Sequence, residues 1–253
     1  MDCYYYKEIN TSENPILKNV DLTIILVMEN STRFRPCDFI LNLSKKTVIQ
    51  YNKGFKACKK PDSITKAPTD IIHAYYTAFS YADNYDNVLI IEEDAEILNN
   101  DIEHYKKIDA FIEKPFKILS FGTNGKFKKI NKDFYEVKTP HGAQAQIFSK
   151  EIRTVIKKHI FENDFSGEID TTYMNNIVTV YNFPLIVQKF PETENFKSWG
   201  GNPFLNKLGV KILNLDKKPE GWYILHLISK LREYTIQFIV LILLIVVFIK
   251  YFH

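Results

Sequence analysis

The sequence predicts an α/β fold, with a largely parallel sheet flanked by helices and one apolar helix at the C-terminus. Three observations support this. Short apolar runs alternate with stretches of helical periodicity, which is typical of α/β proteins. The length of 253 residues suits one such domain with a small appendage. The C-terminal end contains an almost unbroken apolar run, as a membrane-spanning helix would.

The strands are predicted from short apolar runs. Residues 19–28, NVDLTIILVM, form a continuous run typical of a strand that is buried on both faces. The run from Val88 to Ile91 is similar. Residues 53–68 are basic and show no periodicity, which predicts a loop. We therefore expect strands at 19–28, 38–43, 47–51, 88–91, 116–122, 143–149 and 183–190, and a hairpin at 125–137.

The helices are predicted from apolar residues that recur every three or four positions, together with start signals. Pro68 and Asp70 mark a helix start near Thr69. Ser149 is a suitable N-cap for a helix that begins at residue 150. We expect helices from Thr69 onward and at 101–113, 150–160, 168–178 and 221–234.

The overall charge and the cysteines exclude some classes of protein. Lys and Arg total 33 against 30 Asp and Glu, a formal charge of +3. This near-balance argues against a dedicated nucleic-acid-binding protein, which normally carries a strong basic stripe. Cys3, Cys37 and Cys58 show no zinc-site spacing. They are most simply interpreted as free thiols in a reducing compartment.

The C-terminal run predicts a single-pass membrane anchor. Between residues 236 and 249 only Gln237 is not apolar, and no helical polar face is visible. Lys230 and Arg232 flank the run on its N-terminal side, so the positive-inside rule places the globular domain in the cytosol. The alternative is a buried C-terminal helix. The expected organisation is a domain at 1–222, a juxtamembrane segment at 223–233 and an anchor at 234–253.

A cluster of acidic residues ends the predicted strand at Val88–Ile91. Glu92, Glu93 and Asp94 follow it directly. Ligands of open α/β sheets bind outside the carboxyl ends of the strands. Carboxylates gathered there repel one another, and a divalent cation that bridges phosphates would compensate. The alternative is that Asp94 caps the next helix and both glutamates are merely solvated.

The segment around this cluster resembles glycosyltransferase family 25. That family includes bacterial lipooligosaccharide galactosyltransferases and collagen galactosyltransferases. In residues 70–97, DIIHAYYTAFSYADNYDNVLIIEEDAEI, His73 matches the family's histidine, and Glu92-Glu93-Asp94 stand where the family has Glu-Asp-Asp. The middle acid therefore departs from the pattern. Further similar stretches lie at 141–156 and 169–198, and a weaker one lies at 24–34.

The resemblance implies a GT-A fold, which is a Rossmann-like mixed sheet flanked by helices. It also implies a nucleotide-sugar donor, often UDP-galactose, a cation such as Mn²⁺ or Mg²⁺, and transfer with inversion. Within this pattern Asp94 is the expected metal ligand, and Glu92 is the second acid, on the metal or on the donor ribose. Glu93 is a further candidate contact for the donor, and its side chain is expected to point away from that of Glu92, because side chains alternate along a strand. His141 is a further candidate for the metal or for a phosphate.

The remaining candidates are residues that we expect to contact the nucleotide-sugar donor or the acceptor. Asp170 matches the family's base, which takes the acceptor proton; Glu168 is the substitute, and helix capping is the alternative role of Asp170. Arg33 and Lys66 are candidates for the diphosphate. His73 is a candidate donor contact, or else a core or capping residue. Residues 199–201, Trp-Gly-Gly, could form an acceptor-binding loop.

These inferences predict a membrane-anchored inverting hexosyltransferase. It would move galactose or glucose from a nucleotide sugar, such as a UDP-sugar, to a hydroxyl of a glycan or protein acceptor, with no nucleic-acid partner. One alternative is an inactive, membrane-tethered GT-A-like scaffold, because Glu93 replaces Asp. The other is a metal-dependent phosphohydrolase or nucleotidyltransferase that uses the same acids.

Overall fold

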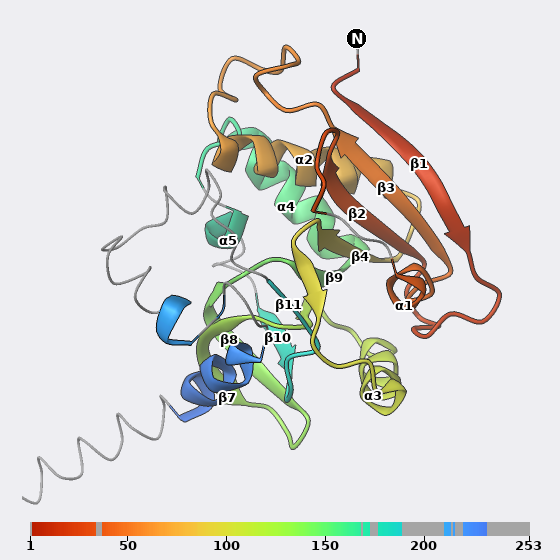
Figure 1. Cartoon of the computed structure of the whole chain (residues 1–253), viewed down its shortest axis with the longest axis vertical. Coiled ribbons are helices and arrows are strands. Elements are labelled where there is room, and N and C mark those ends of the chain that lie inside the picture. Colours follow the sequence, from red (N-terminus) through yellow and green to blue (C-terminus); the bar gives the residue numbers. More distant parts are fainter. Residues whose placement is uncertain are drawn as a thin grey trace, which may run out of the picture.

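The protein has a mixed α/β fold in which helices flank a large mixed sheet (Figure 1). The computed structural model describes residues 2–33, 37–167, 169–172, 177–188, 210–213, 215 and 220–231. The strands are β1 (Tyr4–Thr11), β2 (Leu22–Met28), β3 (Lys46–Asn52), β4 (Asn87–Glu92), β5 (Ala95–Ile97), β6 (Ile118–Ser120), β7 (Asn124–Lys129), β8 (Phe134–His141), β9 (Ala145–Ser149), β10 (Val178–Tyr181) and β11 (Ile186–Gln188). The helices are α1 (Asp38–Leu41), α2 (Ala67–Tyr81), α3 (Ile102–Ile112), α4 (Lys150–Glu162) and α5 (Ile169–Thr172), and a further helix covers 221–231.

The large sheet has the order β1-β3-β2-β4-β9-β6-β10-β8-β7. β2 runs parallel to β3 and β4, and β6 runs parallel to β10. β9 lies antiparallel between β4 and β6, and antiparallel pairs also form both edges of the sheet. The expectation of a largely parallel sheet is therefore wrong, whereas the mixed sheet implied by the family resemblance is confirmed. Strand direction depends on connections that apolar runs alone do not reveal.

Side chains that alternate along the central strands fill two cores, one on each face of the sheet. Ile24 and Ile90 point into the core under α2 and α4. Ile25 and Leu89 point into the core under α1 and α3. This period of two is what places consecutive residues of β4 on opposite faces, and it continues into the acidic turn that follows β4.

Most predicted elements are confirmed, with specific exceptions. Ser149 caps α4 by accepting a hydrogen bond from the Ile152 amide, as expected. Residues 38–43 were expected to form a strand, but 38–41 form α1. A short apolar run fits either element, so periodicity alone cannot separate them. The sequence patterns did not predict β1, β5 or β10.

The predicted membrane anchor at 234–253 lies outside the described residues, as does Arg232. Among the helices that the structure describes, none is long and apolar enough to span a bilayer.

The N-terminal strand is fastened to the rest of the domain by what we term the N-terminal clamp, formed by Cys3, Cys58, Lys60 and Asp70. Cys3 and Cys58 form a disulfide, so the expectation of three free thiols is wrong, and Cys37 alone is free and exposed. The Lys60 ammonium forms an ion pair with the Asp70 carboxylate. The Lys60 side chain is 1% exposed and the Asp70 side chain 6%. It also donates to Asn52 Oδ1 at 2.6 Å and to the Tyr4 hydroxyl at 2.9 Å.

The buried ion pair yields a stability prediction. Lys60→Met should lower the free energy of unfolding by about 3–5 kcal/mol, because it leaves the Asp70 carboxylate buried without its counter-charge. Urea unfolding of the oxidised protein, shortened after residue 233, measures this. The double variant Lys60→Met/Asp70→Leu should recover much of the loss. Lys59→Met is the matched control, since Lys59 is exposed; equal effects of Lys59→Met and Lys60→Met would contradict the prediction.

Candidate functional site

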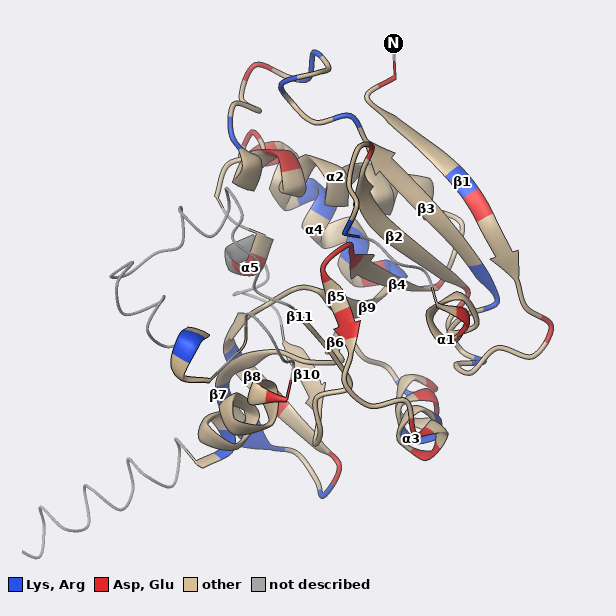
Figure 2. Ribbon diagram, viewed as in Figure 1, with Lys and Arg blue, Asp and Glu red and all other residues tan. Residues whose placement is uncertain are grey.

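An acidic turn at the carboxyl end of β4 is the centre of the candidate site. β4 ends at Glu92, and β5 begins at Ala95 and pairs with β11 in the second sheet. The turn therefore joins the two sheets, and Figure 2 shows its acidic residues in the middle of the molecule. β2, β3 and β4 run parallel, so their carboxyl ends meet at this same edge. This is the edge at which open α/β sheets bind their ligands.

Glu92 is partly buried and faces the α2 side of the sheet. The Tyr75 hydroxyl donates to Glu92 Oε1 at 2.9 Å and also lies 3.1 Å from the Ala143 carbonyl oxygen. Burial, followed by the charge of Asp94, raises the pKa of Glu92 to about 8. The charge of Asp170 acts in the same direction, so these three carboxylates share one electrostatic environment.

Asp94 is held by the second sheet. The Gln188 side-chain amide donates to Asp94 Oδ2 at 3.0 Å. Asp94 Oδ1 is buried and has no hydrogen-bond donor among the described residues. Burial raises the pKa of Asp94 to about 6. A buried carboxylate oxygen without a donor is unusual in folded proteins and indicates that a ligand could complete it.

Two buried glutamines add further acceptors, Gln146 on the neighbouring strand β9 and Gln144 directly before it. Gln146 lies directly opposite Ile90, and the Glu92 amide donates to the Gln144 carbonyl at 2.9 Å. The Gln144 amide group donates to the Gly122 carbonyl, and the Gln146 amide donates to the Gly142 carbonyl at 3.4 Å. Both side-chain carbonyl oxygens lack a donor in the described part of the chain. The site is therefore rich in oxygen acceptors and poor in donors, which suits a cation.

Asp170 reaches this site from α5. The Gly142 amide donates to Asp170 Oδ2 at 3.1 Å. Gly142 has a φ of 97°, and a Cβ atom there would lie 2.7 Å from Gln144 Oε1, so a side chain would disturb both groups. Asp170 therefore lies near enough to Glu92 for its charge to raise the pKa of Glu92. Glu168, the alternative base, lies outside the described residues.

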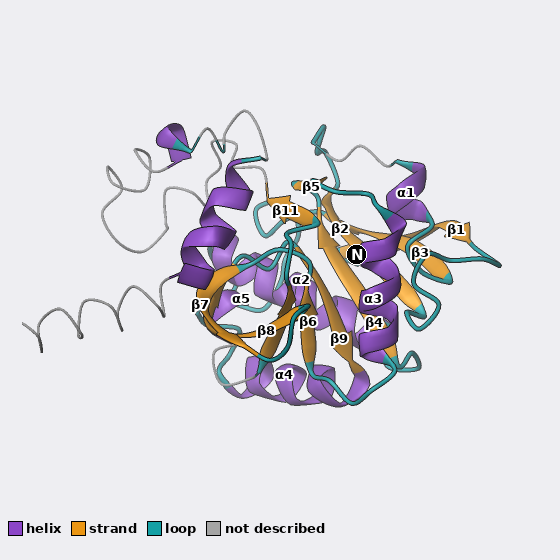
Figure 3. Cartoon of the chain, turned by 90° about the horizontal axis from the view of Figure 1, so that it is seen from below, coloured by secondary structure: helices purple, strands orange, loops and turns teal. Residues whose placement is uncertain are grey.

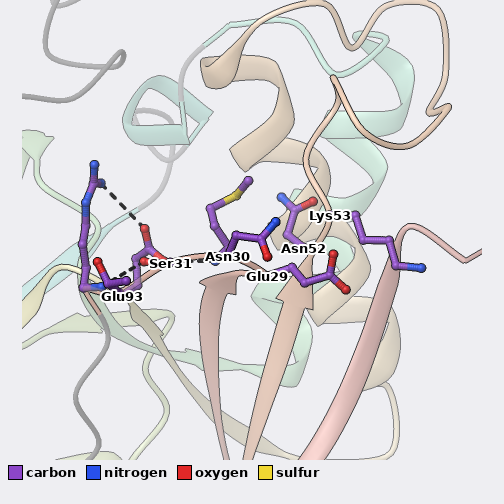
Figure 4. A pocket seen from close by; sticks show the side chains of 9 residues that line it. Glu29, Asn30, Ser31, Asn52, Lys53 and Glu93 are labelled. Atoms are coloured by element: carbon purple, nitrogen blue, oxygen red, sulfur yellow. Dashed lines mark hydrogen bonds and ion pairs between the residues drawn. The ribbon is translucent and has the colours of Figure 1, made fainter.

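Glu93 points to the opposite side of the turn from Glu92, as strand alternation predicts. Its Oε2 accepts the Met28 amide at 3.0 Å, and its Oε1 lies 3.7 Å from the Arg33 guanidinium. Both groups border a cavity of about 360 Å³ over the carboxyl ends of β2 and β3 (Figure 4). The residues that line it are Met28, Glu29, Asn30, Ser31, Thr32, Arg33, Asn52, Lys53 and Glu93.

Other predicted site residues have different surroundings. His73 accepts or donates a hydrogen bond to the Tyr4 hydroxyl at 2.8 Å, and burial and the charge of Lys60 lower its pKa to about 4. It therefore lies beside the N-terminal clamp. Lys66 is exposed, and its backbone forms the N-cap of α2. His141 is exposed at the end of β8. Residues 199–201 lie outside the described residues.

Side chains that the sequence reasoning missed complete the site. Tyr75, Gln144, Gln146 and Gln188 contact the acids or lie beside them. Gln144 and Gln146 had a visible signal, because they alternate with apolar residues inside an otherwise buried strand. Within the described ranges, no three His, Cys, Asp or Glu side chains come together closely enough to hold a metal ion by themselves.

Comparisons with known proteins give little guidance. No protein-family model matches the sequence, and neither does any curated protein. The protein A197 from STIV is similar in structure, with a TM-score of 0.41 and 12% identity over 69% of this chain and 96% of that one. Apo UDP-glucose pyrophosphorylase has a TM-score of 0.37 and 13% identity, over 64% of this chain and 72% of that one. Similarities this distant carry no argument about function.

The raised pKa values predict how stability depends on pH. The folded state holds protons that the unfolded chain releases near pH 4.5, so the free energy of unfolding should fall as pH rises from about 5 to about 8. The fall should reach a few kcal/mol, at about 1.4 kcal/mol per pH unit for one group. Urea unfolding at several pH values measures it. Glu92→Gln should flatten the curve, whereas Glu103→Gln, at an exposed position of α3, should not. Parallel curves for all three proteins would refute the assignment.

Proposed function

We propose that the protein is a metal-dependent glycosyltransferase of GT-A type. It would transfer a hexosyl group, galactose or glucose, from a UDP-sugar or a related nucleotide sugar to a hydroxyl of a glycan or protein acceptor. The observation that carries the proposal is the acidic turn at the carboxyl ends of parallel strands, with acids on one side and a cavity on the other. The sequence resemblance at residues 70–97 supports the same activity.

The donor set fits Mn²⁺ or Mg²⁺. Asp94 Oδ1 has no hydrogen-bond donor among the described residues. The charge of Asp94 acts on Glu92 and raises its pKa. Both cations prefer oxygen ligands and commonly use one or two carboxylates together with phosphate oxygens. Two carboxylates of the protein are therefore enough, provided that the donor diphosphate supplies the rest. When bound, the cation would supply positive charge to the diphosphate leaving group.

The cavity fits the nucleoside part of the donor. Its volume of about 360 Å³ lies within the usual range for small-molecule sites, roughly 300–1,000 Å³. Asn30, Asn52 and Glu93 offer hydrogen-bonding groups for a base or ribose, and Lys53 and Arg33 offer positive charge. Glu93 lines the cavity and is the chain neighbour of Glu92 and Asp94, so the proposal requires the diphosphate to extend from the cavity across the turn to the two acids.

Asp170 is the general base in this proposal. In an inverting transfer the acceptor oxygen bonds to the anomeric carbon while the bond from that carbon to the phosphate oxygen breaks. The acceptor proton must go to a nearby base. The hydrogen bond from the Gly142 amide holds one oxygen of Asp170, which orients the carboxylate that would take the acceptor proton.

We also propose that residues 234–253 form a single-pass membrane anchor with the domain in the cytosol. The support is the apolar run and the flanking Lys230 and Arg232. The Cys3–Cys58 disulfide points the other way, because disulfides are more usual in oxidising compartments. We assign the domain to the cytosolic side of the membrane from Lys230 and Arg232, because basic residues beside a span act directly on its orientation during insertion.

Metal-dependent nucleotide binding tests the proposed function. The chain shortened after residue 233 should bind UDP more tightly with Mn²⁺ than with EDTA, because the cation links the diphosphate to the acids. Isothermal titration calorimetry measures both affinities. Asp94→Ala should erase the difference, and Asp62→Ala is the matched control at an exposed loop position. Equal affinities for UDP with and without metal would refute the proposal.

The base assignment has its own test. Asp170→Asn should lower kcat by about 10²–10⁴, the usual contribution of a positioned general base. The amide oxygen of asparagine can still accept the Gly142 hydrogen bond, so UDP affinity and the melting temperature should change little. Glu168→Gln is the matched control. A larger loss for Glu168→Gln than for Asp170→Asn would move the role to Glu168, and full activity of both variants would exclude both.

A further inference from the structure

The helix 221–231 presents an unusual apolar surface to solvent. Ile224, Leu227 and Ile228 are 50%, 53% and 53% exposed, and Tyr223 is exposed beside them. Their spacing places all four on one side of the helix. No charged residue interrupts this set along the helix. We call these four side chains the apolar face. Single exposed apolar residues are normal on protein surfaces, whereas a continuous face marks an interaction site.

The opposite side of the same helix is fixed firmly to the domain. The Trp222 indole N–H donates to the Gln188 carbonyl at 2.8 Å. The His226 ring packs edge-on against Phe127 of β7 at 4.9 Å. The Lys230 ammonium donates to Asn182 Oδ1 at 2.6 Å and lies 5.4 Å from the Tyr135 and Phe183 ring centres. The helix therefore has a defined orientation beside β7 (Figure 3), and the apolar face is exposed to solvent.

Two features identify the partner of this face. The chain that follows the helix is the apolar run that begins near residue 234, so the apolar face leads directly into a segment that suits hydrocarbon. The hairpin beside the helix is basic, with Lys126, Lys128, Lys129 and Lys132 exposed along β7 and its turn (Figure 2). Exposed apolar side chains and clustered lysines on one domain are a combination that suits the interface of an anionic bilayer.

We infer that the helix 221–231 lies on the membrane surface and docks the domain there through its apolar face. The partner is an anionic lipid bilayer. The inference rests on the proposed membrane anchor and does not depend on glycosyl transfer. The helix is then more than a tether, because its firm attachment at Trp222 and Lys230 holds the whole domain in one orientation on the bilayer.

The docked orientation would place the candidate site close to the lipid surface. Gln188, whose carbonyl accepts the Trp222 N–H, donates its side-chain amide to Asp94. A Cβ atom added at Gly142 would lie 3.6 Å from the Trp222 ring, and the Gly142 amide donates to Asp170. The first turn of the docking helix is thus also a wall of the site.

Fluorescent probes on the full chain test this inference. In a Cys37→Ser background, single cysteines replace Ile224, Leu227 or Ile228 and carry an environment-sensitive fluorophore. The protein is reconstituted into vesicles of phosphatidylcholine with phosphatidylserine. Probes on the apolar face should be quenched by lipid-borne nitroxide and should be several-fold less accessible to aqueous iodide than a probe at Val155→Cys. Val155 is the matched control, since it is also apolar and 49% exposed, on α4.

Charged substitutions on the same face provide the second arm. With the probe at Leu227→Cys, the changes Ile224→Asp and Ile228→Asp together should restore iodide access, while vesicle flotation shows that the protein stays on the membrane. Val155→Asp should leave the probe shielded. A melting curve in detergent confirms folding of each variant.

Each other outcome overturns the inference in a distinguishable way. If iodide reaches the probes as readily as it reaches residue 155 while the protein stays on vesicles, the docking face is refuted and the membrane anchor is not. Shielding with energy transfer between labelled copies assigns the face to a second copy of the chain. Shielding without nitroxide quenching or energy transfer assigns it to the chain's own C-terminal segment. Release from the vesicles removes the anchor as well.

Discussion

The withdrawal of Glu92 and Asp94 from water is the constraint on which the rest of the site depends. Like charges that lose hydration repel one another, and a fold keeps them only where other groups compensate. Here the compensation is partial. Tyr75 and Gln188 each supply one donor, and within the described residues neither carboxylate forms an ion pair with a lysine or an arginine. The surrounding glutamine oxygens add acceptors where donors would be expected. Such an arrangement has a deficit of positive charge, which a bound cation would remove.

The period of two along β4 places Glu92 and Glu93 on opposite sides of the acidic turn. Glu92 continues the face that carries Ile90, and Glu93 turns toward β2 and Arg33. One acid therefore belongs to the acceptor-rich side and its neighbour to the cavity. The N-terminal clamp also holds one wall of the cavity. Asn52 lines the cavity, and its side chain is hydrogen-bonded to Lys60 and Asp70. A buried ion pair is a poor source of stability but fixes the position of the groups that it contacts.

Sequence reasoning reached the acidic turn, because a buried strand that ends in three acids breaks the local pattern in a visible way. It also reached Asp170, through a motif match alone. It missed Gln188 and Trp222, because their contacts with the site depend on how distant segments pack, and nothing local marks them. β1 was missed because the exposed Tyr5 stands between two partly buried tyrosines, and a register shift between Glu8 and Asn10 interrupts the alternation. α1 was mistaken for a strand because a short run such as Asp38–Leu41 fits both periods. The pairing of Cys3 with Cys58 likewise depends on tertiary packing.

Trp222 connects the helix 221–231 with the acidic part of the molecule. On one side of its ring a hydrogen bond leads through Gln188 to Asp94, and on the other side Gly142 leads to Asp170. A rigid shift of the helix 221–231 relative to the sheet would therefore displace groups that hold both carboxylates. Packed interiors respond to such shifts by moving between discrete arrangements, because they have little free volume. Under the proposed docking, a bilayer would hold one side of the helix and the site would hold the other, which would restrict those arrangements. The position of the helix and the geometry of the acids would then be coupled.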